Sequence, residues 1–413
     1  MKLLFYIAPA HGHVNPLLPA VQALVSRGHE VCVYLTREFE PAVRRAGATF
    51  RPLDDRFGLP EKLQPGANSA DASHIMPVMI RFMRECMNEA PRLVEQARTE
   101  HADGVVYDPM ALWGQAVARV LGLPRALFQT SFALSHSPTL QRELRKDFQG
   151  RLPPPALLLG LLHFLVNSER LHWFHGLPRL FINSAFHATE DLNIIPIPKS
   201  YQPDAASFDE RFLFVGPSIL PREDRGDFPL ERLEGRPVLY ISLGTTPMNH
   251  RPDFYTACFE AFRDTRWQVV MACGKSLDPA SLGPVPANVL VRQRAPQLDV
   301  LARARVFLTH GGMNSIMEGL WHGVPLAVFP QFADQPLNAG RVRELGLGLT
   351  LAREEALRPE LLRSVVERLD TEPDFRARVA AFQTTLRESG GHLRAAEALE
   401  RFFTERGARQ RAA

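Results

Sequence analysis

The sequence predicts an α/β protein made of two Rossmann-like halves, and three observations lead to this fold class. The chain has 413 residues, more than one compact domain usually holds. Strand-like apolar runs alternate with helix-like segments from the first residues onward. The alternation restarts at residue 237, after a stretch rich in proline, glycine and charge that is typical of a linker.

The first half opens with a strand, a helix and a second strand. Residues 2–8 form an unpatterned apolar run, as expected for a strand buried on both faces. The helix is predicted from Asn15 as N-cap, with Pro16 in its first position and Gly28 just beyond its end. Residues 30–36 supply the next strand, so this unit predicts a parallel sheet.

The second half shows the same alternation. Apolar runs recur in residues 237–246, 267–274, 288–297, 304–312 and 324–332. We therefore expect an N-terminal domain over residues 1–216, a linker over 217–236, a C-terminal domain over 237–390 and a final helix over 391–413.

Composition and charge limit the function classes. A formal net charge of +3 without a dense basic block argues against a nucleic-acid surface. The apolar run at residues 156–166 is about half the length of a membrane span, and the N-terminal run leads into polar residues without a cleavage site. Neither a transmembrane helix nor a signal peptide is expected. Four scattered cysteines predict buried free thiols, which suits a cytoplasmic protein.

Polar residues follow the apolar run that ends at Thr309, where a parallel sheet binds its ligands. His310 and two glycines precede the start of a predicted helix, whose amides attract a phosphate. Asn314 and Ser315 add side-chain donors at the same point. Glu318, one turn later on the helix, suits ribose hydroxyls. The pattern predicts a ligand with a diphosphate and a sugar-like diol.

Asp334 and Gln335 follow the next apolar run. A carboxylate beside an amide both accepts and donates hydrogen bonds, which suits a polyol. A solvated loop would explain such a pair on its own. Its place one strand away from the predicted phosphate site favours a sugar contact instead.

Other kinds of site do not fit. No Gly-x-Gly-x-x-Gly follows the first strand, which argues against a dinucleotide oxidoreductase, and no Gly-x-Ser-x-Gly is present for a hydrolase. Residues 272–276 suggest a phosphate loop, but Val269 stands where its first glycine belongs. No His, Cys or Asp pattern has metal-ligand spacing, so we expect no metal and no other cofactor.

Several longer motifs occur in a characteristic order. The most specific is "THGGMNSIMEGLWHGVPLAVFPQFADQP", preceded by "APQLDVLARA". The N-terminus has "APAHGHVNPLLPAVQALVSRGHEV", and the middle has "FVGPS" and "YISLGTT". In these motifs the chain closely resembles family-one nucleotide-sugar glycosyltransferases, especially the bacterial macrolide and natural-product type.

The resemblance implies the GT-B fold, in which two Rossmann-like domains face each other across a cleft and the final helix crosses back to the N-terminal domain. The N-terminal domain would bind the acceptor and the C-terminal domain the nucleotide-sugar donor. The implied donor contacts are Ser242, Thr245, His310, Gly312, Asn314 and Ser315 for the diphosphate, Gln297 and Glu318 for ribose, and Asp334 and Gln335 for the sugar.

His13 is the predicted catalytic base. It lies between the first strand and the helix expected from Pro16, where the helix dipole disfavours a charged imidazole. The family pairs this histidine with an aspartate after a strand, and Asp108 in "GVVYDPMALWG" matches that context. Asp108 would orient the imidazole and stabilise its cation. A structural turn histidine is the alternative reading of His13 taken alone.

The donor is expected to be UDP-glucose, because a deoxygenated sugar would leave Asp334 and Gln335 partly unpaired. One residue departs from the family pattern. Many relatives carry tryptophan just before the "PQ" element to stack on uracil, whereas this chain has Arg294. A guanidinium also stacks on a base, and a dTDP-deoxysugar donor stays an alternative.

The acceptor is expected to be an apolar molecule with a hydroxyl group, such as a macrolide, polyketide or phenolic, with a lipid or sterol as the alternative. The apolar run over residues 153–166 suggests a pocket or lid, with Phe128, Phe132 and Trp173 nearby. Ordinary core packing explains these residues equally well. His11 would be structural or would face the acceptor.

The predicted activity is thus an inverting, metal-independent hexosyl transfer. Two rival functions use the same scaffold. A UDP-sugar epimerase would turn over its substrate without an acceptor. A catalytically silent nucleotide-sugar-binding protein is disfavoured by the presence of His13 and Asp108.

Overall fold

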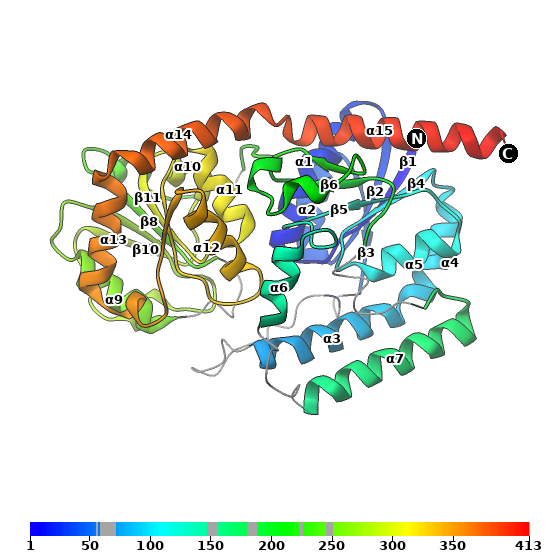
Figure 1. The fold of residues 1–413 in the computed structure, drawn as a ribbon, viewed down its shortest axis with the longest axis horizontal. Coiled ribbons are helices and arrows are strands. Elements are labelled where there is room, and N and C mark those ends of the chain that lie inside the picture. Colours follow the sequence, from blue (N-terminus) through cyan, green and yellow to red (C-terminus); the bar gives the residue numbers. More distant parts are fainter. Residues whose placement is uncertain are drawn as a thin grey trace. The chain divides into compact units, whose positions relative to one another are not determined.

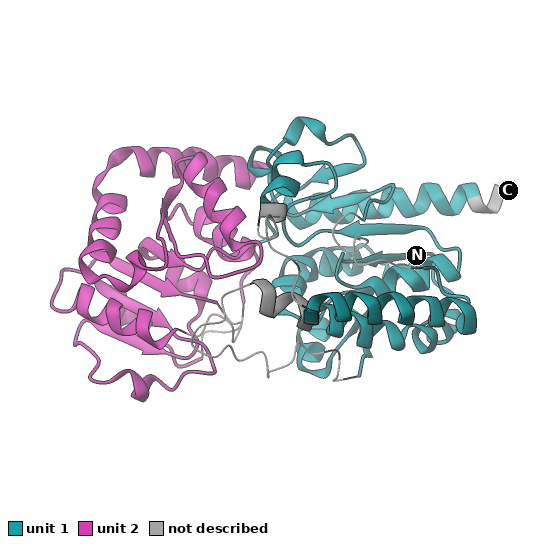
Figure 2. Cartoon of the chain, turned by 60° about the horizontal axis from the view of Figure 1, so that its bottom comes forward, with its two compact units in different colours: residues 1–60, 71–218, 389–413 teal, residues 61–70, 219–388 magenta. Residues whose placement is uncertain are grey.

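The computed structural model describes residues 1–54, 57, 72–146, 155–179, 188–222, 226–244 and 251–412. The chain divides into two compact units (Figure 2). Unit 1 contains residues 1–60, 71–218 and 389–413, and unit 2 contains residues 61–70 and 219–388. Each unit is built around its own parallel sheet covered by helices, so the predicted α/β class with two Rossmann-like halves is confirmed.

The sheet of unit 1 has seven parallel strands in the order β3-β2-β1-β4-β5-β6-β7. The order reverses between β1 and β4, because the chain first builds outward on one side and then returns to the other. Ligands of such sheets bind beyond the carboxyl ends of the strands at this reversal. The strands are β1 (Lys2–Tyr6), β2 (Glu30–Leu35), β3 (Thr49–Pro52), β4 (Gly104–Tyr107), β5 (Arg125–Phe128), β6 (Asn193–Ile195) and β7 (Phe212–Phe214).

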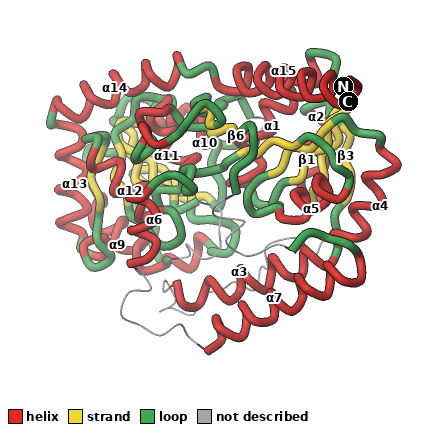
Figure 3. Tube along the Cα trace, turned by 45° about the vertical axis from the view of Figure 1, so that its right-hand side comes forward, coloured by secondary structure: helices red, strands yellow, loops and turns green. Residues whose placement is uncertain are grey.

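Helices cover both faces of this sheet and bury a separate apolar cluster on each. One cluster lies under α1 and α15, and the other includes residues of α3, α4, α5 and α7. Figures 1 and 3 show α3 and α7 side by side. The helices are α1 (His11–Ser26), α2 (Glu40–Arg45), α3 (Ala72–Asn88), α4 (Ala90–Glu100), α5 (Leu112–Val120), α6 (Pro138–Lys146), α7 (Pro155–His175) and α15 (Gly391–Ala412).

The start of α1 differs from the prediction. Ala10 rather than Asn15 is the N-cap, and its carbonyl accepts from the amides of His13 and Val14 over 2.9 and 3.0 Å. Pro16 lies inside the helix, where it cannot donate a hydrogen bond to the carbonyl of Gly12. His13 is therefore part of the first helical turn rather than of a loop before it.

The C-terminal helix packs on the N-terminal unit, as predicted. Figure 1 shows α15 running along α1. Phe403 is buried against Gly104 of β4, where a Cβ atom would lie only 2.3 Å from the ring. Arg27 donates to Glu400 over 2.8 Å, and the amide of Gly391 donates to the carbonyl of Val215 over 2.7 Å.

The sheet of unit 2 has six parallel strands in the order β10-β9-β8-β11-β12-β13, with the reversal between β8 and β11. The strands are β8 (Val238–Ser242), β9 (Gln268–Ala272), β10 (Val289–Arg292), β11 (Ala304–Thr309), β12 (Leu326–Val328) and β13 (Gly348–Thr350). The helices are α9 (Pro252–Phe262), α10 (Gln297–Leu301), α11 (Met313–Trp321), α12 (Gln335–Glu344), α13 (Pro359–Thr371) and α14 (Pro373–Glu388).

Two further expectations concern the whole chain. All four cysteines are free and buried, as predicted. Among the helices that the structure describes, none combines the length and the hydropathy of a membrane span.

Candidate active site

His13 and Asp108 lie together at the reversal point of unit 1. His13 follows β1 and Asp108 directly follows β4, and these strands are neighbours. The imidazole Nδ1 lies 3.3 Å from a carboxylate oxygen of Asp108. The His13 side chain keeps 25% of its surface exposed, whereas the Asp108 side chain has none. One ring nitrogen of His13 thus faces the buried carboxylate of Asp108. The exposed part of the ring remains accessible to a substrate.

Backbone amides hold the Asp108 carboxylate in place. Its Oδ2 accepts from Ala8 over 2.5 Å, and its Oδ1 accepts from Met110 over 2.7 Å and from Ala111 over 3.2 Å. These three hydrogen bonds fix the orientation of the carboxylate, so Oδ2 faces the His13 ring.

Thr130 is a member of this group that the sequence analysis missed. Its hydroxyl lies 3.4 Å from the same Nδ1 of His13. Thr130 follows β5, the strand next to β4, so three adjacent strands each contribute one polar residue. The signal in the sequence was a polar residue two positions after the apolar run that ends at Phe128.

In unit 2, the ring of His310 packs between two glycines. A Cβ atom on Gly244 would lie 2.7 Å from the ring, and one on Gly312 would lie 2.5 Å from Nε2. Gly244 has a φ of +81° and follows β8, while Gly312 is the N-cap of α11. The predicted role of Gly312, together with the adjacent Gly311, was to let a phosphate approach the backbone. The geometry adds a second role, since a larger residue at Gly244 or Gly312 would displace the histidine.

The electrostatics of His310 differ from those of an ordinary surface histidine. Burial lowers the pKa of His310 to about 4, and a hydrogen bond with the backbone of Ser242 opposes part of this effect. The side chain is 9% exposed. His310 is therefore neutral near pH 7 and has a single N–H, which the backbone of Ser242 engages, so the ring brings no charge to this corner.

The other predicted diphosphate contacts surround the same corner. Asn314 and Ser315 are half-buried in the first turn of α11, where helix amides concentrate. Ser242 ends β8, and its hydroxyl accepts from the amide of Gly244 over 3.3 Å, which holds the loop. Thr245 lies outside the described residues. The ends of two neighbouring strands, β8 and β11, and the start of α11 thus provide all the described members of the predicted phosphate site.

The predicted ribose contacts touch each other. The Gln297 amide donates to Oε2 of Glu318 over 2.6 Å, and the hydroxyl of Tyr240 donates to Oε1 of Gln297 over 3.2 Å. Arg222 donates to Oε1 of Glu318. Glu318 is only 2% exposed, and the partly exposed Arg222 supplies the opposite charge beside it. The sequence analysis named two members of this network and missed Arg222 and Tyr240.

The predicted sugar contacts lie at the start of α12, one strand further along the sheet. Asp334 is its N-cap residue, and Gln335 is its first residue and 5% exposed. The side-chain carbonyl of Gln335 accepts from the amides of Gln331 and Phe332 over 2.8 and 3.3 Å. Asp334 accepts from Asn338 over 3.2 Å. Because the side-chain carbonyl of Gln335 already accepts two hydrogen bonds, its NH₂ group is the part that can donate to a ligand.

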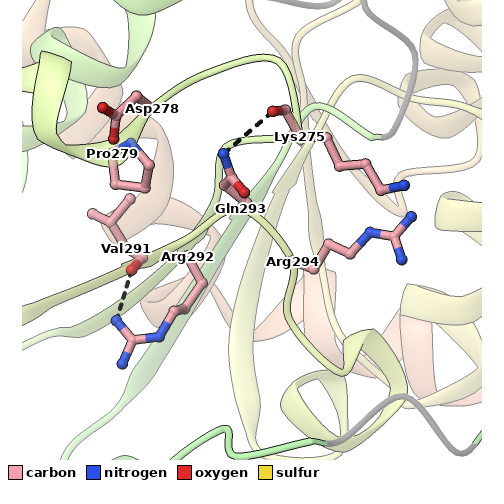
Figure 4. A pocket seen from close by; sticks show the side chains of 7 residues that line it. All are labelled: Lys275, Asp278, Pro279, Val291, Arg292, Gln293 and Arg294. Carbon is pink, nitrogen blue, oxygen red and sulfur yellow. Dashed lines mark hydrogen bonds between the residues drawn. The ribbon is translucent and has the colours of Figure 1, made fainter.

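Arg294 lines a hollow of about 830 Å³ at the carboxyl ends of β9 and β10 (Figure 4). Its side chain extends to the same side as that of Lys275, and among the described residues neither makes an ion pair. Gln293 holds this wall by donating to the carbonyls of Lys275 and Leu277 over 3.2 and 3.1 Å. The hollow offers two cations to a ligand.

The predicted acceptor residues do not form one cluster. Phe128 is 1% exposed within the apolar cluster beneath α1, and Phe132 is 3% exposed and stacks on Tyr201 at 5.6 Å. Trp173 is 74% exposed on α7. His11 meets the edge of Phe39 at 5.1 Å. Both phenylalanines pack as core residues do, and little of their surface remains for a ligand.

Comparison with known proteins gives consistent matches. The family described as UDP-glucoronosyl and UDP-glucosyl transferase matches residues 234–380. The chain is 37% identical to the NDP-glycosyltransferase YjiC of Bacillus licheniformis over 403 residues, covering 97% of each chain. It is 31% identical to the oleandomycin glycosyltransferase of Streptomyces antibioticus, covering 98% of this chain and 92% of that protein.

A solved structure agrees over nearly the full length. The calicheamicin glycosyltransferase CalG4 superposes with a TM-score of 0.76 at 34% identity, covering 98% of both chains. The predicted resemblance and GT-B architecture are confirmed by these matches. This chain belongs to the UDP-glucoronosyl and UDP-glucosyl transferase family and is a nucleotide-sugar glycosyltransferase.

Proposed function

We propose that this enzyme transfers glucose from UDP-glucose to a hydroxyl of an apolar small molecule, with inversion at the anomeric carbon and without a metal ion. The contact between His13 and Asp108 at 3.3 Å carries this proposal. A partly exposed imidazole backed by a buried carboxylate is an arrangement for proton removal from a weakly acidic hydroxyl.

In the proposed reaction, His13 takes the acceptor proton on its Nε2 as the acceptor oxygen attacks the anomeric carbon. The bond between that carbon and the diphosphate breaks, and UDP leaves with the bonding electrons. Attack from the face opposite the leaving group inverts the configuration. Asp108 contacts Nδ1, so it stabilises the imidazolium at the moment of proton uptake.

UDP leaves as an anion, and the corner around His310 is the proposed place for its diphosphate. The amides of the first turn of α11 and the hydroxyl of Ser315 offer hydrogen bonds there, and the neutral His310 packs beside them. Preorganised donors of this kind stabilise developing charge without reorganising during the reaction. Lys275 and Arg294 add positive charge at the neighbouring hollow.

The donor sugar is inferred from Asp334 and Gln335, since a carboxylate beside an amide donor suits a sugar that keeps its hydroxyls. The acceptor class is inferred from relatives. The similar proteins include enzymes named for oleandomycin and calicheamicin, which supports a natural-product acceptor.

The test is to incubate the purified protein with UDP-glucose and a panel of macrolide, polyketide and phenolic acceptors, following UDP and products by mass spectrometry. We expect UDP release that depends on an acceptor, a β-glucoside by NMR, and no loss of rate with EDTA. A large preference for a dTDP-deoxysugar would refute the donor assignment. UDP-glucose turnover without an acceptor would indicate an epimerase, and no turnover with any donor would indicate a binding protein.

A further inference from the structure

We propose that Arg222 determines how the enzyme recognises the ribose of its donor, by holding Glu318 as an oriented carboxylate. The inference rests on the proposed nucleotide site. Arg222 comes from the segment before β8 that the sequence analysis interpreted only as a linker, and the family resemblance gave it no role.

The geometry places two different donors on the two oxygens of one carboxylate. Arg222 donates to Oε1 of Glu318, and Gln297 donates to Oε2 over 2.6 Å. The Glu318 side chain is 3% exposed, whereas that of Arg222 is 29% exposed. The Arg222 side chain is therefore partly exposed to solvent while its guanidinium contacts the buried carboxylate of Glu318.

A buried carboxylate without a cation partner takes up a proton more readily, because burial disfavours its charge. A protonated carboxyl is also a much weaker acceptor for a hydroxyl than a carboxylate is. Arg222 supplies the opposite charge beside this buried carboxylate, and the two donors fix the plane of its oxygens. The remaining lone pairs can then accept from ribose hydroxyls.

Gln297 alone cannot replace this function. Its amide supplies one neutral hydrogen bond, and its own carbonyl is engaged by Tyr240 over 3.2 Å. Gln297 orients one oxygen, while Arg222 provides the charge. We therefore expect Arg222 to act on selectivity for ribose over 2′-deoxyribose more than on affinity for the phosphates or the base.

The experiment compares UDP with 2′-deoxyuridine diphosphate, which differs only in the hydroxyl at issue. Binding of both to the full-length protein is measured by calorimetry for wild type, Arg222→Gln, Arg222→Lys and the control Arg232→Gln. Arg232 is exposed in the same segment and contributes to no described part of the site.

Wild type should prefer UDP by about tenfold or more, since a hydrogen bond to a charged group is worth about that factor. Arg222→Gln should reduce the preference to roughly twofold, and Arg222→Lys should fall between, because it keeps the charge without the planar fork. Arg232→Gln should match wild type.

The graded result separates this role from a structural one, because Arg222→Lys keeps the positive charge and should restore part of the preference that Arg222→Gln loses. Thermal unfolding verifies that each variant is folded.

Two results would overturn the inference. One is an unchanged preference in folded Arg222→Gln, and the other is tighter UDP binding by that variant, which would make Arg222 a competitor of the ribose. Failure of wild type to bind either nucleotide would instead refute the proposed function. The two failures are therefore distinguishable.

Discussion

The two units place their polar residues at the same point of the same kind of sheet. In unit 1, His13 follows β1 and Asp108 follows β4, the strands between which the order reverses. In unit 2, Ser242 ends β8 and His310 follows β11, which are the corresponding strands. The fold thus determines where a site forms, and the side chains determine its chemistry.

The two histidines are built for opposite tasks. His13 keeps a quarter of its surface exposed and faces a carboxylate held by backbone amides. His310 is buried between glycines, and its pKa is lowered to about 4. The first environment favours taking up a proton, and the second disfavours it. The following predictions test this difference, beginning with the largest expected effect.

Replacing His13 should stop the reaction while leaving the donor site intact. We expect His13→Ala to lower kcat by a factor on the order of 10³, the typical contribution of a positioned general base. UDP binding should stay within about twofold of wild type, because His13 belongs to unit 1 and the proposed UDP contacts to unit 2. Initial rates and calorimetry measure the two quantities.

The matched control is His101→Asn, because His101 is an exposed histidine of the same unit at a φ of +49°, which asparagine tolerates. It should retain the wild-type rate. A His13→Ala enzyme that transfers sugar at a near-normal rate would remove the base from the proposed mechanism.

Asp108→Asn should affect both the reaction and the stability. We expect kcat to fall on the order of 10²-fold, because the imidazolium loses its counter-charge. Both carboxylate oxygens accept backbone amides, from Ala8 and from Met110. In either orientation the asparagine NH₂ group must face one of these amides, which costs about 1–3 kcal/mol of stability. Thermal unfolding and initial rates check the pair of effects. A variant as stable as wild type would contradict the observed role of the carboxylate in the loop.

The sequence predicted the sheets and the local site of unit 2 better than the assembled site of unit 1. His310, Gly312 and Ser315 are close in sequence, so one strand-to-helix turn brings them together. His13 and Asp108 are 95 residues apart in the sequence. Their pairing was predicted from the resemblance to the family and not from the alternation of strands and helices. Periodicity identifies strands but not which strand ends meet.

What the sequence missed depends on contacts across strands. Thr130 joins its site through the order of the strands, and Arg222 joins its site because the segment before β8 meets α11. The start of α1 was misplaced because Pro16 was assigned to the first position, which proline prefers, whereas the helix already begins at His11. Phe128 was assigned to the acceptor site from its apolar character, which does not distinguish a pocket wall from a core.

Gly312→Ala tests the packing of His310. The new Cβ would lie 2.5 Å from Nε2, so the ring must move. We expect UDP affinity to fall about tenfold and stability to fall by about 1–3 kcal/mol, as for other overpacked sites. Gly340→Ala in α12 is the control, since no atom lies within 4 Å of its Cβ position and alanine favours a helix. Equal UDP affinity in the two variants would show that the ring position is unimportant.

The smallest effect concerns the pH dependence of stability. The pKa of His310 is lowered from 6.5 to about 4 by folding, so the unfolded chain binds the proton first as pH falls. Its contribution to stability is therefore complete above about pH 6.5 and is lost progressively down to about pH 4. His310→Gln has no such proton to bind. Between about pH 7 and about pH 5, wild type should lose roughly 2 kcal/mol more of its unfolding free energy than this variant, measured by urea titration. Identical losses in the two proteins would mean that burial does not suppress the charge of His310, and that the contrast between the two histidines has another origin.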